Sequence, residues 1–447
     1  KMLKTICKVI TCICLISIVV CSICINAAEL NSLDAWAKEV KKNCKGSTIT
    51  LAFATHTSTD AFQKMTPEFE KLTGIKVNWD VMETNYLKNK QLIDHTGNSS
   101  RYDVFMVDGF WMDEYGSKKV IIPLEDYLNN PSLTPEWFDF EDIVPAYRNG
   151  IAKYQGKVYG VPTAGETRFL GYRTDLFKKY KKEPPKTLDE LVELARFFNG
   201  KEPNLYGIAL RGQRGIMFAS GWMSILYNFG GGFLDQETGK ITMTDPSTVE
   251  SLKCYLELLK NAPPDVGSYT HEEATSAFMT GRSAMWIDAT AIVPWILDPE
   301  KSKVYDKVDF VPIPKGPEGK YGALAGWSMS IPTTSKNKDA AWAFIVFMTS
   351  KLKAKEYILN EGVPTRTSVY TNPELIVRDF SYPAQLESLE DANRLVEKGI
   401  LWIPAHEKLG QILDRVGYYG SVAFTGKLAP EKVCKDAQKE LEEIVND

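Results

Sequence analysis

The segment from Gly156 to Phe177 constrains the fold more than any other stretch of the chain. It contains two short strand-like runs on either side of a flexible Ala164-Gly165 point. Pro162 ends the first run, because a proline has no backbone N–H to donate to the ladder of a central strand. Two ionisable residues, Glu166 and Arg168, occupy the break. The pattern predicts a chain that crosses between two lobes with polar groups facing the gap. An ordinary hairpin with exposed charges is compatible with the same sequence.

The region before this segment alternates between strand-like and helix-like patterns. The predicted order is strand, helix, strand, helix, strand over residues 47–53, 61–72, 75–82, 86–94 and 103–107. Such alternation predicts a parallel sheet with helical crossovers. Ligands of open parallel sheets bind beyond the carboxyl ends of the strands. Those ends carry His56, Glu83, Asp108 and Trp111.

Size and composition exclude some functions. The chain has 447 residues, of which 44% are hydrophobic and 25% charged, so it is long enough for two or three domains' worth of core. Its formal net charge is −4. A chain without a basic excess gives no reason to expect nucleic acid as a partner.

The N-terminal residues have the pattern of a secretory signal. Three lysines precede an uncharged apolar run over residues 9–25, and small residues follow at Ala27-Ala28. We therefore predict a signal segment over residues 1–27; a retained membrane helix is the alternative, but the run is slightly short for one. Lipidation of Cys21 or Cys24 would provide a membrane anchor, and the sequence leaves this open. Three cysteines follow the signal, far apart in the chain, and are predicted to be free thiols: Cys44, Cys254 and Cys434.

Several ordered motifs resemble one protein family. Gly156-Lys-Val-Tyr-Gly-Val-Pro162, Tyr172-Arg-Thr-Asp-Leu-Phe177 and Ser335-Lys-Asn-Lys-Asp-Ala-Ala-Trp342 are similar to runs in the family-1 extracellular solute-binding proteins, the carbohydrate receptors of bacterial ABC importers. The resemblance extends from about Ser47 to the end of the chain. Within the family, Gly165-Glu166 and the run from Ala284 to Thr290 look most like the receptors for polyols such as mannitol and sorbitol.

The resemblance implies an α/β fold with two lobes and three crossings between them, the type II periplasmic-binding-protein fold. The crossings are expected within residues 156–177, at 307–312 and at 362–366. The N-terminal lobe would comprise residues 28–161 and 310–361, and the C-terminal lobe residues 163–309 and 363–447.

The resemblance also implies a function. We expect a secreted monomer in the bacterial periplasm or at the cell surface that binds a carbohydrate or polyol without a cofactor and without turnover. Hinge closure would deliver the ligand to the permease subunits of an ABC transporter. The sequence predicts contact with the membrane only through the lipid anchor, if one is present.

A polyhydroxyl ligand requires polar groups for its hydroxyls and flat aromatic rings for its C–H faces. The predicted ligand-binding residues lie at strand ends or crossings of both lobes: His56, Glu83, Asp108, Trp111, Glu166, Arg168, Trp222, Trp286, Asp288, Trp327 and Arg366. Glu166 and Asp288 are predicted to bond the ligand from opposite lobes. Taken singly, each charge is also compatible with a solvated surface residue, and each tryptophan with the core.

Enzyme motifs are missing from the sequence. The His271-Glu-Glu-Ala-Thr run lacks the second histidine of a zinc protease, and Gly230-Gly-Gly232 lacks the lysine of a phosphate-binding loop. The alternative that remains is a secreted glycoside-acting enzyme with paired carboxylates, in which Glu83 acts with Glu166 or Asp288. A surface adhesin or scaffold would need repeats, and the chain after the signal has none.

Overall fold

The computed structural model describes residues 33–406 and 408–446. The predicted signal segment, residues 1–27, and the lipidation candidates Cys21 and Cys24 lie outside the described residues. Residues 33–44 are helical and precede the first strand. Within the described residues, no helix combines the length and the hydropathy that a membrane span requires.

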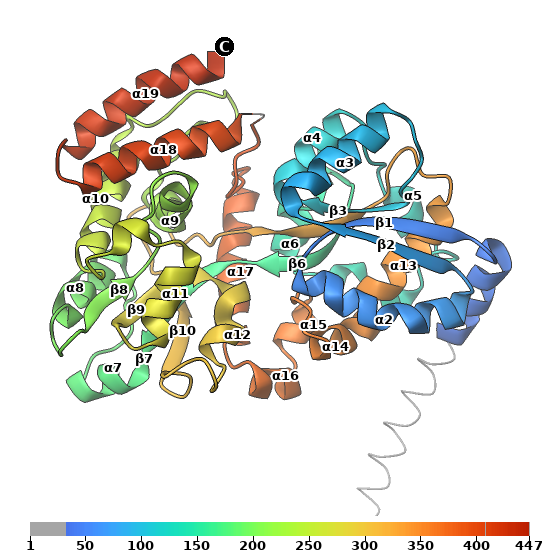
Figure 1. Cartoon of the computed structure of the whole chain (residues 1–447), viewed down its shortest axis with the longest axis horizontal. Helices are drawn as coiled ribbons and strands as arrows, with labels where there is room; N and C mark the ends of the chain where they lie inside the picture. The colour runs from blue at the N-terminus through green and yellow to red at the C-terminus, as the bar shows by residue number, and fades with distance from the viewer. Residues whose placement is uncertain (1–32, 407, 447) are drawn as a thin grey trace, which may run out of the picture.

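The first lobe is built on a five-stranded sheet (Figure 1). Its strands, in spatial order, are β2 (Lys76–Met82), β1 (Thr48–Ala54), β3 (Val104–Asp108), β11 (Ala325–Ser330) and β6 (Val161–Glu166). The first three strands run parallel, and β11 is antiparallel to both β3 and β6. The predicted strand and helix alternation in this region is confirmed, with boundaries that shift by a few residues.

Helices cover both faces of the first sheet. The helices of this lobe are α2 (Thr57–Thr73), α3 (Thr84–Thr96), α4 (Met112–Ser117), α5 (Glu125–Leu128), α6 (Pro145–Gly150), α13 (Lys338–Thr349), α14 (Lys351–Leu359), α15 (Thr367–Tyr370) and α16 (Pro373–Arg378). A short hairpin, β4 (Lys153–Tyr154) and β5 (Lys157–Val158), precedes β6. In Figure 1, α3 and α4 lie on one side of the sheet, and α2 and α13 lie on the other.

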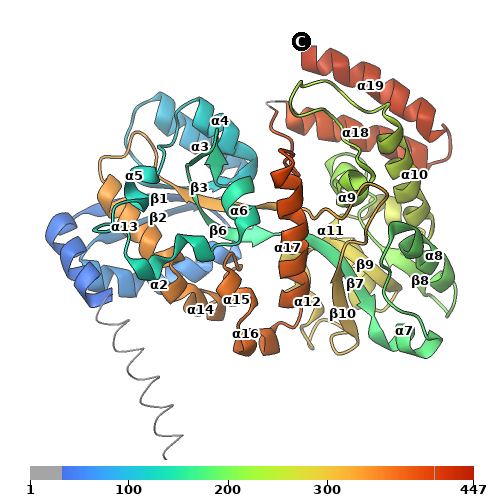
Figure 2. The same ribbon diagram turned by 180° about the vertical axis from the view of Figure 1, so that it is seen from behind.

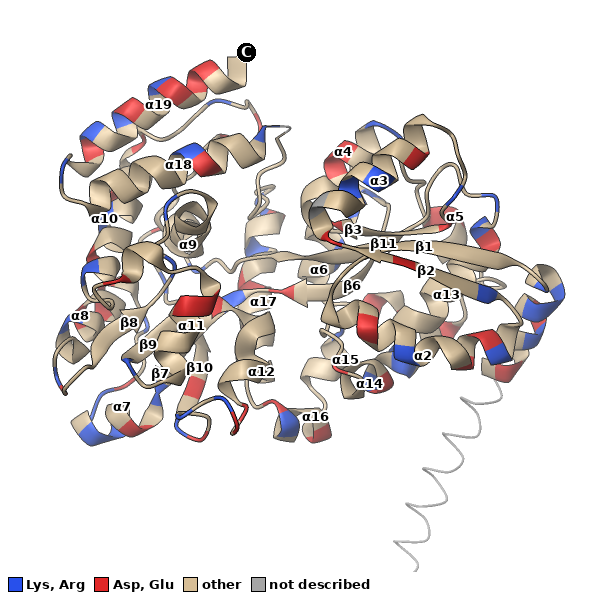
Figure 3. Cartoon of the chain, viewed as in Figure 1, with Lys and Arg blue, Asp and Glu red and all other residues tan. Residues whose placement is uncertain are grey.

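The second lobe is built on a four-stranded sheet. Its strands are ordered β10 (Val308–Pro312), β7 (Arg168–Arg173), β9 (Ser283–Ala289) and β8 (Tyr206–Ala209). Its helices are α7 (Thr174–Tyr180), α8 (Leu188–Phe198), α9 (Ile216–Leu226), α10 (Pro246–Lys260), α11 (His271–Met279), α12 (Val293–Ile296), α18 (Leu409–Phe424) and α19 (Pro430–Asn446). Capping boxes at Thr187 and Thr270 begin α8 and α11. Figure 3 shows charges of both signs along the outer helices of both lobes.

The chain leaves the first sheet later than the sequence predicts. Strand β6 pairs with β11 as far as Glu166, and β7 begins at Arg168 in the other sheet, so the passage is at Thr167 rather than at residues 161–163. Residues 307–312, predicted as the second crossing, instead include β10, which pairs with β7. The chain returns to the first sheet only at Ala325.

The third passage is also later than predicted. Arg366, in the predicted crossing, is bonded to the carbonyls of Thr349, Phe138 and Asp139 in the first lobe. The next contact with the second sheet is made by Phe380, whose ring lies 5.9 Å from that of Phe310. Helix α17 (Tyr382–Glu397) then packs against α6 of the first lobe and against β10 and β7 of the second, and Figure 2 shows it between the lobes.

The described cysteines form no disulfide. Cys44 and Cys434 are buried free thiols, and Cys254 is a half-buried one. The prediction of free thiols is therefore confirmed for these three residues. Hydrophobic packing rather than crosslinking holds both lobes together.

Candidate functional site

Strand pairing gathers three of the predicted residues at one edge of the first sheet. Trp327 of β11 lies opposite Asp108, the last residue of β3, and opposite Ala164 of β6 on its other side. Glu166, the last residue of β6, lies opposite Ala325. Because β11 is antiparallel to both neighbours, its beginning meets their ends. Asp108, Trp327 and Glu166 therefore share one edge.

A second set of charged residues gathers at one edge of the second sheet. Arg168 begins β7 and lies opposite Ala289, the last residue of β9, next to Asp288. Strand β8 runs parallel to β9 and ends at Ala209, so Arg211 follows at the same edge. Arg168, Arg211 and Asp288 are thus brought together from three separate parts of the sequence.

Thr167 joins the two edges. Its backbone N–H donates to Thr290 Oγ1 (3.2 Å) and its carbonyl accepts from the Thr290 N–H (2.9 Å), which fixes it to the second lobe. Its hydroxyl donates to the carbonyl of Ala323 (2.7 Å), in the chain that returns to the first lobe. Two crossing segments therefore lie side by side, and Figure 1 shows β6 running directly towards the second lobe. We call Asp108, Glu166, Trp327, Arg168, Arg211 and Asp288 the interlobe site.

The two first-lobe carboxylates are half-buried, and neither forms an ion pair within the part of the chain that the structure describes. Asp108 accepts from the N–H of Phe110 (3.0 Å). Burial raises the pKa of Asp108 to about 7, although the Phe110 bond and Lys88 oppose the rise. No donor from the described residues bonds the carboxylate of Glu166.

Burial also raises the pKa of Glu166. Arg211 and Arg168 oppose this rise, whereas Asp288 adds to it. These charges therefore act on Glu166 from the second lobe, across the junction at Thr167. By contrast, the charges that shift the pKa of Asp108, those of Glu166 and Lys88, both belong to the first lobe.

The two arginines of the second lobe are held firmly. Arg168 is buried and donates to the carbonyl and hydroxyl of Ser220 and to the hydroxyl of Ser224 (2.9 Å). Its guanidinium also lies 5.2 Å from the ring centre of Trp402. Burial and the neighbouring Arg211 lower the pKa of Arg168 to about 9. Arg168 therefore ties the start of β7 to helix α9.

Arg211 and Asp288 form a buried ion pair. The Arg211 Nε donates to both carboxylate oxygens of Asp288, at 3.1 and 2.9 Å, and its Nη2 donates to Oδ1. The side chain of Asp288 is fully buried, and that of Arg211 is 11% exposed. Despite its burial, Asp288 has a lowered pKa, because Arg211 bonds it and Arg168 lies near.

Aromatic rings lie beside the first-lobe carboxylates. The Trp327 ring packs edge-on against Trp111, with centroids 5.6 Å apart, and lies 6.2 Å from the ring of His56. Trp327 is half-buried and Trp111 is buried. His56 caps helix α2 by accepting from the N–H of Ser58, and burial lowers its pKa. The predicted aromatic surface is thus placed next to the carboxylates on the first lobe.

Among the described residues, four of the predicted ones make no hydrogen bond, ion pair or ring contact with the interlobe site. Trp222 is fully buried and donates to Ser251 Oγ (2.9 Å), and the fully buried Trp286 donates to Thr275 Oγ1 (3.2 Å), so both are core residues. Glu83 is exposed at the N-terminus of α3 and makes no capping bond.

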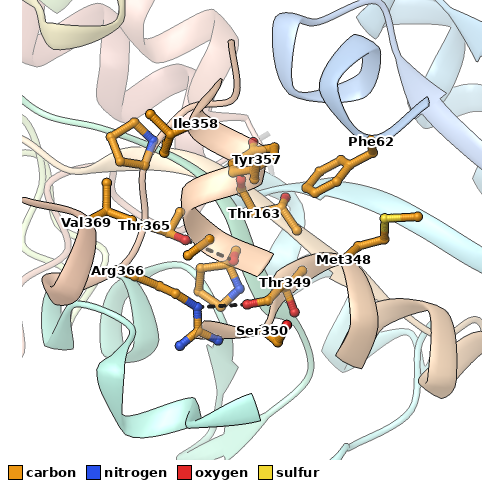
Figure 4. Close-up of a pocket in the computed structure, with 13 residues that line it drawn as sticks. Phe62, Thr163, Met348, Thr349, Ser350, Tyr357, Ile358, Thr365, Arg366 and Val369 are labelled. Carbon is orange, nitrogen blue, oxygen red and sulfur yellow. Dashed lines mark hydrogen bonds between the residues drawn. The ribbon is translucent and has the colours of Figure 1, made fainter. Parts of the chain in front are cut away.

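Arg366 is the fourth residue that the structure removes from the predicted set. It is 2% exposed, and its guanidinium bonds three first-lobe carbonyls. Figure 4 shows it beside a small pocket between α13, α14 and β6, where it donates to the Thr349 carbonyl. Tyr357 closes the same pocket by donating to the Thr163 carbonyl (2.7 Å). This pocket lies within one lobe, and Arg366 has a structural role in it.

The sequence analysis missed Arg211, Ser220 and Trp402. The rule of strand ends could have identified Arg211, because it follows β8 directly. Ser220 lies within helix α9, and Trp402 lies in the irregular chain between α17 and α18. No local pattern places either of these beside Arg168.

A recess between the lobes adjoins this site. The empty space in it is about 480 Å³, including space open to solvent. Residues of the first lobe and of the segment after α17 line it, among them Phe110, Asp113, Lys153, Trp402 and Pro404. Phe110 follows the Asp108 strand end, and Trp402 packs under Arg168.

Comparison with known proteins identifies the family. Residues 54–353 match the model of the bacterial extracellular solute-binding proteins. The chain belongs to this family. The predicted family and its two-lobe α/β fold are therefore confirmed.

The relatives of this solute-binding protein include several for polyols. It is 28% identical over 412 residues to the mannitol-binding protein of Pseudomonas aeruginosa, covering 88% of this chain and 92% of that one. An ABC transporter solute-binding protein from Agrobacterium radiobacter, solved in complex with ribitol, is 28% identical with a TM-score of 0.75; the match covers 90% of this chain and 99% of that one.

A second solved relative has the same coverage. The ABC transporter solute-binding protein from Agrobacterium vitis, with bound D-mannitol, is 29% identical with a TM-score of 0.71. All of these relatives are binding proteins, so they lend no support to the alternative of a glycoside-acting enzyme.

Proposed function

We propose that this solute-binding protein is the receptor of an ABC importer for a short polyol, and that it binds its ligand at the interlobe site without turnover. The observation that carries the proposal is the pair of half-buried carboxylates, Asp108 and Glu166, beside Trp327. Carboxylates accept hydrogen bonds from hydroxyls, and an indole ring covers C–H groups. A linear polyol offers hydroxyls along its length and C–H groups between them.

The size of the site supports a short ligand. The charged groups come from two sheet edges joined by the single residue Thr167, and the rings of Trp327 and Trp111 beside them pack edge-on rather than in a flat row. A long oligosaccharide would gain more from a row of stacked rings. The solved relatives with ribitol and D-mannitol agree with this proposal.

Closure is proposed as a hinge motion about the chain passages between the lobes. These are Thr167, the segment 313–324 and the segment around Phe380. Only a closed arrangement brings first-lobe carboxylates and second-lobe arginines onto one ligand, so the ligand shifts the population towards it. The closed receptor would then dock on the permease. We further propose that the protein acts as an extracytoplasmic monomer in one of two forms: cleaved near Ala27, or cleaved before Cys21 or Cys24 with a lipid on that cysteine.

A binding screen tests the function. Purified protein without residues 1–27 is heated with ribitol, D-mannitol, D-sorbitol, maltotriose or L-amino acids. A polyol with micromolar affinity, about −8 kcal/mol, should visibly raise the melting temperature and should be recovered unchanged after long incubation. A preference for maltotriose or an amino acid would contradict the polyol assignment, and a hydrolysed or oxidised product would contradict a receptor.

Protein purified from its native cell tests the proposed export and processing of the N-terminus. Its intact mass should show either cleavage near Ala27 or a lipid on one of the two cysteines. A full-length unmodified chain would contradict both forms of the proposal.

A further inference from the structure

We propose that Arg211 is the second-lobe residue that contacts the ligand, and that Asp288 is a positioning residue which holds Arg211 in place. This inference rests on the proposed function, since it assumes a ligand between the lobes. It reverses the roles expected from the sequence, where Asp288 was predicted to bond the ligand and Arg211 was not considered.

Asp288 is enclosed by the protein and is already bonded to Arg211. Its side chain is fully buried. One oxygen accepts from the Arg211 guanidinium and from the backbone N–H of Ala289 (2.7 Å), and the other accepts from Arg211 Nε (2.9 Å). A ligand hydroxyl could reach this carboxylate only after the pair had separated, which would leave a buried charge without its partner.

Arg211 has an N–H donor that is not used within the described part of the chain. A guanidinium carries five N–H groups in a fixed fork. Asp288 accepts from Nε and Nη2, and Ser220 Oγ accepts from Nη1 (3.2 Å). The second N–H of Nη2 has no acceptor among the described residues. The Arg211 side chain is 11% exposed, whereas that of Asp288 is fully buried, so of the two only Arg211 presents surface that a ligand can contact.

The guanidinium of Arg211 is held rigidly by its neighbours. Ser220 Oγ accepts from Arg168 Nη2 (2.6 Å) as well as from Arg211 Nη1. Arg168 is fixed in turn by Ser224 and by the ring of Trp402. Arg211 is therefore braced on two sides, and a braced donor loses little conformational entropy when a ligand binds.

The arrangement also predicts which ligands are selected. Glu166 offers an acceptor from the first lobe, and Arg211 offers a donor from the second. A hydroxyl group can donate to one and accept from the other, so neighbouring hydroxyls of a neutral polyol can bridge both walls. A sugar acid would place its carboxylate near Glu166 and Asp108, and like charges repel. We therefore expect D-mannitol to bind more tightly than D-mannonate.

A double-mutant cycle tests the inference. The Kd for D-mannitol is measured by calorimetry for the parent, Arg211→Gln, Asp288→Asn and the double variant. We expect Arg211→Gln to weaken binding about tenfold to a hundredfold and Asp288→Asn about tenfold. The double variant should match Arg211→Gln, because Asp288 acts through Arg211. If Asp288→Asn still weakens binding in the Arg211→Gln background, Asp288 contacts the ligand directly and the inference fails. A parent-like Kd for Arg211→Gln would also overturn it.

The pair of Arg173 and Asp175 is a matched control. Arg173 Nε and Nη2 donate to the two oxygens of Asp175, at 2.7 and 2.6 Å, and the Arg173 side chain is 12% exposed. This pair lies at the opposite end of β7 from Arg168. Arg173→Gln should leave the Kd unchanged, and a loss equal to that of Arg211→Gln would show a general effect of breaking a paired arginine.

Arg211→Lys covers the case in which Asp288→Asn does not fold. Lysine keeps the charge and can bond Asp288, but it cannot fork between Asp288 and a ligand. We expect several-fold weaker binding with a parent-like melting temperature, and a parent-like Kd would overturn the inference.

A wrong ligand class can be distinguished from wrong roles for Arg211 and Asp288. If the parent ignores D-mannitol and binds maltotriose, the proposed ligand class fails, and the same cycle with maltotriose decides the roles of Arg211 and Asp288.

Discussion

The edges of the two sheets that meet at Thr167 carry opposite kinds of polar chemistry. The first-lobe edge has half-buried carboxylates, Asp108 and Glu166, whose pKa values burial raises. The second-lobe edge has a carboxylate, Asp288, whose pKa is lowered because Arg211 bonds it and Arg168 lies near. Carboxylates therefore have no cationic partner bonded to them on the first-lobe edge, among the described residues, whereas the carboxylate on the second-lobe edge is paired with an arginine.

This difference indicates which hydrogen-bonding groups each lobe contributes to ligand binding. An unpaired, partly desolvated carboxylate gains a strong hydrogen bond when a hydroxyl arrives. A paired one has already made its bonds and can only orient its partner. The first lobe therefore offers acceptors that the ligand completes, and the second lobe offers a fixed donor. The aromatic residues differ in the same way, since Trp327 is half-buried on the first lobe and Trp286 is fully buried in the second.

The largest expected effect is on stability, and it concerns the buried Trp286 of the second lobe. Trp286→Ala should destabilise the protein by about 3–5 kcal/mol, because it removes a fully buried ring and its bond to Thr275. Urea unfolding checks the stability, and calorimetry at a temperature where the variant is folded should give an unchanged Kd for D-mannitol. A large change in the Kd without loss of stability would show that Trp286 contacts the ligand.

The next largest effect is on binding, and it concerns the half-buried Glu166 of the first lobe. Glu166→Gln should weaken D-mannitol binding about tenfold to a hundredfold, because a charged acceptor of ligand hydroxyls is lost. Calorimetry measures it, with the exposed Glu272→Gln on helix α11 as a control that should bind like the parent. Equal affinities for Glu166→Gln and the parent would show that this carboxylate does not meet the ligand.

The third prediction concerns pH and Asp108. Its pKa is about 7 in the folded protein, and a protonated carboxyl is a poorer acceptor. At pH 6 only about a tenth of the molecules would have Asp108 ionised, so the apparent affinity should fall roughly tenfold from its value at pH 8. Asp108→Asn should bind more weakly at pH 8 and lose most of this dependence. A parent whose Kd is constant from pH 8 to pH 6 would contradict the prediction.

The same pKa has a consequence for stability without ligand. Because the folded pKa of Asp108 lies above its usual value, the group contributes stability that is fully present below the usual pKa and is lost as the pH rises through about 7. Asp108→Asn should therefore raise the melting temperature of the ligand-free protein at pH 8. A lower melting temperature at that pH would show that ionised Asp108 is stabilised in the fold.

The smallest expected effect concerns the open aromatic ring. Trp327→Ala should weaken binding by about 1 kcal/mol, roughly fivefold, through loss of a flat surface against the ligand. Its cost in stability should be smaller than that of Trp286→Ala because Trp327 is only half-buried. If Trp327→Ala binds as tightly as the parent in calorimetry, the ring belongs to the packing of Trp111 and His56 alone.

Local sequence patterns determined much of this protein. Alternating periods fixed the strands and helices of the first lobe, because burial of one face requires period 2 in a strand and about 3.6 in a helix. The capping boxes that begin α8 and α11 are likewise local, since each joins residues three positions apart. Strand ends and the break after Pro162 were sufficient to nominate Asp108, Glu166 and Arg168, since ligands of such sheets bind beyond the ends of the strands.

Tertiary structure alone decided the remaining assignments. Whether Trp286 faces the core or a ligand depends on which face of β9 is covered, and a fully buried strand has no alternation to reveal it. The role of Asp288 depends on Arg211, which lies 77 positions earlier and meets it only because β8 and β9 end at the same edge. Arg366 was assigned to the wrong surroundings for the same reason: its partners at Phe138 and Asp139 are more than 220 positions away. A charge is a ligand group or a structural one according to its partners, and long-range pairing selects those partners.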